Sequence, residues 1–197
     1  MAPLGNGASI TAVHQGFSID TRMGLTPTGG LIMDTRNGDL DPCVIIHLMR
    51  EMKLDTSATE ELVDHRCGLL GISGVRSDMR TPHEAAGSSS DQQLAIGMSC
   101  YTTAKQVGAM SIALGGVDQI VFTGGIDQYD CQVRLAICAR LSSLGVAQDE
   151  ARNNVGKGVV TCNASSCVVR VLPSEEDEQI ARHTRLLCIR AGLRLAR

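Results

Sequence analysis

Two short apolar runs, each followed by a turn and a segment with helical spacing, constrain the fold of this chain most. The run QIVF, residues 119–122, ends in Thr-Gly-Gly, and residues 131–144 then place Val133, Ile137 and Leu141 at helical spacing. The stretch VVRVLPSEEDEQIARHTRLL, residues 168–187, repeats the order of strand, turn and helix. Strands that alternate with helices predict an α/β domain.

The rest of the chain divides into a hairpin, a long loop and three further helical segments. Residues 8–19 alternate around Gln15-Gly16, which predicts a β-hairpin with glycine in the turn. Residues 20–42 are rich in Gly, Pro, Asp and Thr, and loops of that length are usually functional. Helices are predicted after Pro42, over Ser57 to His65 and over Asp91 to Leu114. A loop punctuated by glycines is predicted for GLLGISGVRSDMR, residues 68–80.

Composition excludes several classes of function. The chain of 197 residues carries a net charge of −3 and has only two Tyr, two Phe and no Trp, so neither a basic nucleic-acid surface nor aromatic stacking platforms are indicated. Its apolar stretches are far shorter than the roughly 20 residues that span a bilayer, and no signal-peptide core is present. The eight cysteines lack CxxC spacing and are expected to be reduced and mostly buried. We therefore expect a cytoplasmic protein that binds neither nucleic acid nor membrane.

Three glycine turns could let backbone N–H groups approach a phosphate. They lie at Leu4-Gly5-Asn6-Gly7, at Gly71 to Gly74 and at Gly124-Gly125, and none has the P-loop or dinucleotide spacing. Each turn alone is more often an ordinary tight turn than a ligand site.

Arg36 and an acidic cluster are the candidate charged groups. Arg36, in the loop DTRNGDLDP, could grip a carboxylate or phosphoryl group, or could equally pair with Asp39 or Asp41. The acids Glu175 to Asp177 follow Ser174, which is a good helix N-cap, so that capping and the helix dipole explain much of the cluster. One of these carboxylates could instead hold Mg²⁺ together with phosphates and waters.

Six ordered motifs between Leu4 and Leu187 resemble the acetate kinase family of the actin-like ATPase superfamily. LGNGAS, DTRMGLTP and DTRNGDLDP look like the family's LGNG-AS, DTSMG-TP and GTR-GD-DP signatures, and GLLGISGVRSDMR, ALGGVDQIVFTGGI and VLPSEEDEQIARHT follow in order. The resemblance implies an α/β fold equivalent to the C-terminal half of an actin-like kinase of the acetate and sugar kinase, Hsc70 and actin type. Residues 1–197 would then form a single nucleotide-binding C-terminal domain without the family's N-terminal domain.

The resemblance also implies ligands and site residues. The family transfers the γ-phosphoryl group of ATP to acetate or a similar short carboxylate with Mg²⁺, and it dimerises through this half. Arg36 matches the arginine that engages the substrate and the phosphoryl group, and Glu176 matches the acid associated with magnesium. The positions that match the nucleotide-binding elements are Leu4, Gly5, Asn6, Gly7, Asp78, Met79, Arg80, Gly124, Gly125 and Ile126.

Several positions depart from the family pattern. The family's GIGENS appears as Gly125-Ile126-Asp127-Gln128-Tyr129-Asp130, with a negative side chain at Asp127 where glycine lets the nucleotide approach. Pro3, Arg22 and Asp34 also replace a family His, Ser and Gly. These departures predict weakened ATP binding and an impaired kinase.

Two functions of different class remain from the sequence. The chain could form acetyl phosphate and ADP from ATP and acetate, with the N-terminal half supplied by another chain. Alternatively, it could be a non-catalytic module that binds nucleotide weakly or serves in dimerisation.

Overall fold

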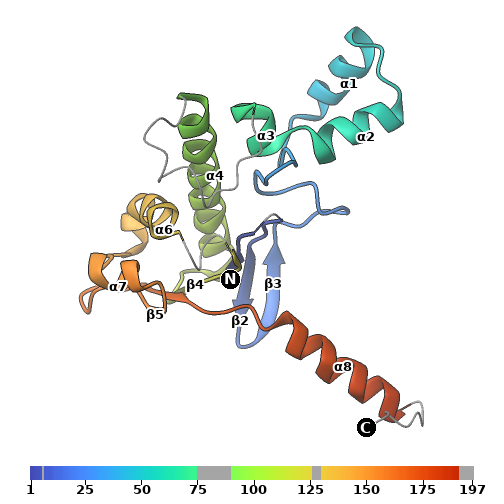
Figure 1. The fold of residues 1–197 in the computed structure, drawn as a ribbon. Helices are drawn as coiled ribbons and strands as arrows, with labels where there is room; N and C mark the ends of the chain where they lie inside the picture. Colours follow the sequence, from blue (N-terminus) through green and yellow to red (C-terminus); the bar gives the residue numbers. More distant parts are fainter. Residues whose placement is uncertain (6, 75–89, 126–129, 191–197) are drawn as a thin grey trace.

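The computed structural model describes the chain except for residues 6, 75–89, 126–129 and 191–197 (Figure 1). The predicted Asn6, Asp78, Met79, Arg80 and Ile126 lie outside the described residues, as does Asp127. The described elements are β1 (Ala2–Pro3), β2 (Thr11–His14), β3 (Phe17–Thr21), α1 (Pro42–Glu51), α2 (Thr56–His65), α3 (Gly68–Ser73), α4 (Ser90–Leu114), β4 (Gln119–Thr123), α6 (Cys131–Cys138), η1 (Ala139–Leu144), α7 (Glu150–Val155), β5 (Gly158–Val159), β6 (Val168–Val171) and α8 (Glu176–Arg190).

A four-stranded sheet forms the centre of the fold, with the strand order β1-β4-β6-β5. β1 and β6 each pair with β4 in parallel, and β5 pairs with β6 in antiparallel orientation. The predicted hairpin is present as β2 and β3, and Gln15 and Gly16 adopt positive φ angles of 50° and 83° in its turn. The hairpin is a separate two-stranded sheet that lies beside the chain entering β1, since Thr11 and Met1 exchange two hydrogen bonds of 2.9 and 2.7 Å. The predicted α/β class is confirmed.

The core lies between this sheet and the helices α4 and α6. Phe122 and Val169 on the central strands are completely buried, as is Ala95 on α4, while Val133 and Ile137 on α6 are 1% exposed. Small residues on α4 lie against neighbouring elements, and α4 contacts α3, α6 and the hairpin. This packing fixes the carboxyl ends of β1 and β4 side by side.

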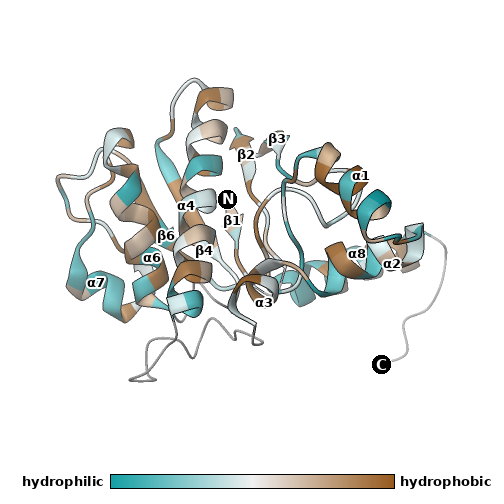
Figure 2. Cartoon of the chain, turned by 90° about the horizontal axis from the view of Figure 1, so that it is seen from above, coloured by the Kyte–Doolittle hydropathy of each residue, from teal (hydrophilic) through white to brown (hydrophobic). Residues whose placement is uncertain are grey.

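Two helical parts extend from this core (Figure 1). The α1–α2 pair lies at one end of the molecule and α8 projects at the other, and neither α1 nor α8 has a buried residue. Hydrophobic positions are visible on both helices in Figure 2, and Ile46, Ile180 and Leu187 are at least half exposed. No helix among the described residues is long and apolar enough to cross a membrane.

Three of the predicted elements differ in detail. The segment that was predicted as a loop from Gly68 contains α3, since Gly71 N donates to the Cys67 carbonyl over 2.9 Å and Gly74 ends the helix with φ of 72°. Gly71 therefore lies within a helix and does not form a phosphate-binding turn. The predicted helix from Cys131 to Leu144 changes to a 3₁₀ helix after Cys138, where Leu141 leaves helical geometry. The N-cap of α8 is Glu175, whose carbonyl accepts from Gln179 N over 3.1 Å, and not Ser174 as predicted.

Asp130 fixes the beginning of α6. Its Oδ1 accepts from Gln132 N at 2.9 Å and from Val133 N at 3.0 Å, so Asp130 is the N-cap of α6. A serine side chain at this position could accept hydrogen bonds in the same way. Replacing Asp130 with Ala is expected to lower the free energy of unfolding by about 1–2 kcal/mol, because the two N–H groups lose their acceptor. Urea denaturation measures this loss. Asp130→Ser is the matched control, and an equal loss in both variants would contradict the capping role.

Candidate active site

Two of the three predicted glycine turns meet at the carboxyl ends of β1 and β4. Leu4 N donates to the Thr123 carbonyl over 2.8 Å, and Gly5 N donates to Gly7 O over 2.9 Å to close the first turn. Gly124 has φ of 100°, and a Cβ on it would lie 2.6 Å from the Leu4 carbonyl oxygen. Glycine is therefore required at position 124 for the two strand ends to approach.

Gly125 lies at the open side of this junction. It is exposed, and a Cβ on it would meet no atom of the described residues within 4 Å. The described part of the two turns thus leaves room for a ligand to approach the backbone.

Arg36 lies near the tip of a loop formed by residues 30–39, beside the Leu4 to Gly7 turn. Two hydrogen bonds between Gly30 and Asp39 close the base of this loop. Asp39 N donates to the Gly30 carbonyl over 3.1 Å, and Gly30 N donates to Asp39 Oδ1 over 2.9 Å. Met33 N donates to the Arg36 carbonyl over 3.1 Å at the tip. Gly68 packs behind the tip, where a Cβ would lie 2.3 Å from Met33 O and 2.7 Å from Arg36 O.

The Arg36 guanidinium makes no ion pair with any residue that the structure describes. Its Nη1 lies 3.5 Å from the Pro27 carbonyl and 3.7 Å from the Met33 sulfur. The two acids that could have paired with it have other partners, since Asp39 forms an ion pair with Arg22 and Asp41 caps α1. Arg22, where the family pattern has serine, therefore contributes to holding the loop.

A cavity of about 200 Å³ brings three predicted site residues together. We call it the Arg36 cavity; it is lined by Pro3, Gly7, Ala8, Ser9, Met23, Pro27, Met33, Arg36 and Glu176. Gly7 presents no side chain to Arg36, and a Cβ there would be 3.6 Å from Arg36 Nη1. Glu176 enters from the first turn of α8, far along the chain from the other two. A guanidinium, a carboxylate and a glycine turn thus share one opening.

Sequence patterns did not single out all the residues around this cavity. Met23, Pro27 and Met33 were not predicted as site residues, although Arg36 Nη1 donates to the Pro27 carbonyl and to the Met33 sulfur. The motif DTRMGLTP, which carries part of the family resemblance, contains Met23 and Pro27 and was the signal that could have indicated them.

The described residues fit Mg²⁺ only if a bound phosphate compound and waters supply most of the oxygen atoms around the ion. They contain no group of three His, Cys, Asp or Glu side chains that could enclose a metal. Mg²⁺ commonly binds through one or two carboxylates plus phosphate oxygens and waters, and Glu176 at the cavity offers one such carboxylate.

The cysteines are free thiols with different accessibility. Cys100, Cys138 and Cys167 are buried, four others are half-buried and Cys43 is exposed. Burial raises the pKa of the Cys67 thiol and of the Cys167 thiol, which keeps both protonated at neutral pH. None of the eight lines the Arg36 cavity.

Comparison with known proteins places these features in a family. The model of the acetokinase family matches residues 1–182. The acetate kinase of Heliobacterium modesticaldum is 44% identical over 183 residues, which cover 92% of this chain and 46% of that protein. The acetate kinase of Pseudothermotoga lettingae is 40% identical over 195 residues, covering 97% of this chain and 48% of that protein.

Solved structures agree with the sequence relatives. Porphyromonas gingivalis acetate kinase superimposes with a TM-score of 0.88 at 38% identity, covering 94% of this chain and 47% of the other. A propionate kinase from Francisella tularensis superimposes with a TM-score of 0.87 at 35% identity, covering 92% and 47%. The chain thus spans about half the length of the relatives that it matches, and its mixed α/β domain has the fold of half of these kinases. The chain belongs to the acetokinase family.

Proposed function

We propose that this chain takes part in the transfer of a phosphoryl group from MgATP to acetate or a similar short carboxylate, as the equivalent of the family's C-terminal half. The observation that carries the proposal is the meeting of Gly7, Arg36 and Glu176 around one cavity. Phosphoryl transfer depends mainly on positioning and on neutralising charge, and these residue types supply both.

Each residue would have a distinct task. Gly7 and Gly124-Gly125 would hold phosphate groups through backbone N–H groups, because glycines allow close approach, while the N–H groups of Leu4 and Gly5 shape the turn by donating to Thr123 O and Gly7 O. Arg36 would orient the substrate carboxylate and donate hydrogen bonds to the oxygens of the transferred group, since its guanidinium is not engaged by an acid of the described chain. Glu176 would hold Mg²⁺, which when bound supplies positive charge next to the phosphates.

Formation of acetyl phosphate by the purified chain tests this function. We expect slow formation with MgATP and acetate, and faster formation when the segment of the Heliobacterium modesticaldum enzyme that this chain does not match is added as a second polypeptide. No product under either condition would overturn the proposal.

A non-catalytic role as an association module is the second candidate. It is favoured by the apolar side chains of α8, because Ile180, Leu186, Leu187 and Ile189 are each more than half exposed. An uncovered apolar surface of this kind usually contacts another chain. Under this alternative the chain forms a homodimer or binds an N-terminal half without turnover, and sedimentation analysis would detect the assembly.

Asp127 provides a prediction for nucleotide binding. Replacing Asp127 with Gly, the residue of the family turn, is expected to lower the dissociation constant for ATP about fivefold, because a negative charge near the phosphates is removed. Isothermal titration calorimetry measures the constant. The matched control is Asp118→Asn, which also removes one negative charge but lies just before the amino end of β4. It should leave the dissociation constant for ATP unchanged. An equal effect of both substitutions would contradict a local role for Asp127.

A further inference from the structure

A second cavity lies beside the loop that carries Arg36. We call it the α3–α4 cavity; its volume is about 570 Å³ and it is lined by Gly30, Ile32, Asn37, Asp39, Leu40, Arg66, Cys67, Gly68, Gly71, Ile72, Met98, Thr102, Lys105 and Gln106. Among the residues that the structure describes, none lines both this cavity and the Arg36 cavity. Its volume lies within the usual range of roughly 300–1,000 Å³ for small-molecule sites.

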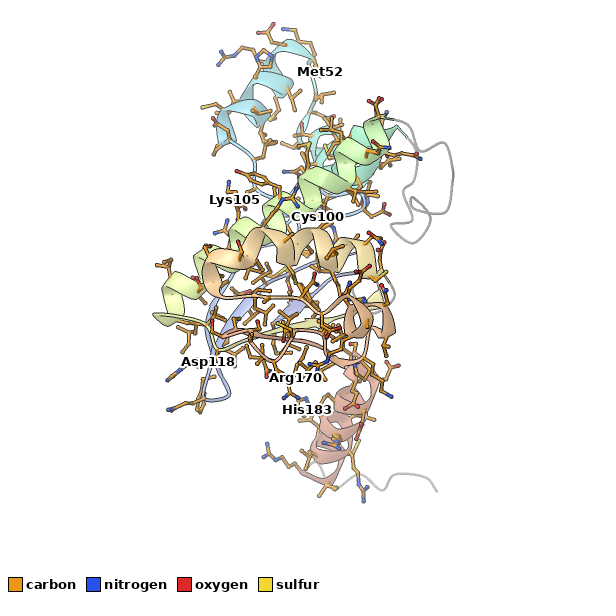
Figure 3. The ribbon with its side chains drawn as sticks, turned by 90° about the vertical axis from the view of Figure 1, so that its left-hand side faces the viewer. Met52, Cys100, Lys105, Asp118, Arg170 and His183 are labelled. Carbon is orange, nitrogen blue, oxygen red and sulfur yellow. The ribbon has the colours of Figure 1, made fainter. Side chains whose placement is uncertain are left out.

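Two cations from different elements border this cavity. Arg66 ends α2 as its C-cap, and Lys105 extends from α4 (Figure 3). Neither forms an ion pair within the described part of the chain, although Lys105 Nζ lies 5.8 Å from the ring centre of Tyr101. Both positive charges are therefore available to an anion.

The acid in the cavity wall is already compensated. Asp39 forms an ion pair with Arg22, and its Oδ1 accepts from Gly30 N at 2.9 Å. Its Oδ2 also lies 3.3 Å from Gln106 Nε2. Together with Arg22, this carboxylate adds no net charge, so the surroundings of the cavity remain positive.

Apolar groups complete the wall between the charges. Ile32, Leu40, Ile72 and Met98 line the cavity, and burial raises the pKa of the Cys67 thiol, which keeps that wall position neutral. A ligand with both an apolar body and one negative charge matches this surface, since the apolar part loses contact with water and the anion meets Arg66 or Lys105.

We propose that the α3–α4 cavity binds a small organic anion with an apolar body, at a site separate from the Arg36 cavity. Gly30, Asn37 and Gly68 line the site and belong to, or pack against, the loop that positions Arg36. The proposal does not rest on phosphoryl transfer, because it concerns binding alone.

Binding of benzoate, with neutral benzamide as the matched ligand, tests the proposal. Ligand-detected NMR titration of the full chain is expected to show benzoate binding, at least about fivefold more tightly than benzamide. Arg66→Gln and Lys105→Gln should each raise the benzoate dissociation constant about threefold, and the double variant about tenfold. Arg170→Gln, which removes a charge on β6 far from Lys105 in Figure 3, should have no effect.

Two further variants locate the site. Thr102→Phe keeps both cations and places a ring into the cavity from α4, so it should abolish benzoate binding while circular dichroism and the melting temperature show a folded chain. Arg36→Ala should leave benzoate binding unchanged. The proposal is overturned if benzoate does not bind, if the folded Thr102→Phe chain binds it normally, or if Arg36→Ala removes the binding.

Discussion

Replacing Arg36 with Ala is expected to reduce acetyl phosphate formation by about 10²–10³-fold, in the chain alone or with an added complementary segment. The guanidinium lies at the Arg36 cavity, and its Nη1 donates to the Pro27 carbonyl and the Met33 sulfur. Removing it takes away the donors that would meet the carboxylate and the transferring oxygens, while no ion pair of the described structure is lost. The rate of acetyl phosphate formation at saturating MgATP measures the effect.

Two controls separate chemistry from stability in this experiment. Arg170→Ala removes an exposed arginine on β6 and should retain the rate, and thermal unfolding should be the same for the Arg36→Ala chain as for the parent. Arg36→Lys should restore only part of the rate, because an ammonium cannot form the two parallel hydrogen bonds of a guanidinium. Full activity of Arg36→Ala would remove Arg36 from the mechanism.

Replacing Gly68 with Ala is expected to lower the free energy of unfolding by about 2–5 kcal/mol. Gly68 has φ of 62°, and a Cβ would lie 2.3 Å from Met33 O and 2.7 Å from Arg36 O. Both neighbours are backbone atoms, so relief requires a shift of the loop itself. We therefore expect the stability loss to be accompanied by displacement of Arg36, measured by urea denaturation and by the rate of acetyl phosphate formation.

Gly108→Ala provides the matched control for this substitution. Gly108 lies within α4, and a Cβ on it would meet no atom of the described chain outside its own helix backbone within 4 Å. Alanine is favoured over glycine in a helix by about 1 kcal/mol, so this variant should be at least as stable as the parent. If Gly68→Ala were equally stable, the close packing behind the Arg36 loop would be contradicted.

The elements of the fold could largely be predicted from local patterns. Alternation around Gln15-Gly16 indicated the β2–β3 hairpin, and Pro42 indicated the beginning of α1, because both signals act through neighbouring residues. The segment from Gly68 was predicted wrongly as a loop. Its glycines suggested a break, but the positive φ of Gly68 and Gly74 is used at the two ends of α3 and not within it.

Local patterns could not predict which residues far apart in the sequence form ion pairs or hydrogen bonds with each other. Local proximity left Arg36 equally free to pair with Asp39 or to face a ligand. In the structure Asp39 pairs with Arg22, 17 positions away, and accepts a hydrogen bond from Gln106 on α4. These choices depend on how α4 packs against the long loop, which no spacing of neighbouring residues encodes.

The sequence by itself determined the α/β class, the family resemblance and the residue types that phosphoryl transfer needs. Only the tertiary structure decided that Gly7, Arg36 and Glu176 line one cavity and that Gly124 lies against Leu4. The physical reason is that parallel strands β1 and β4 bring their carboxyl ends together across more than 100 residues of chain, whereas helix and turn signals report only on residues within a few positions of each other.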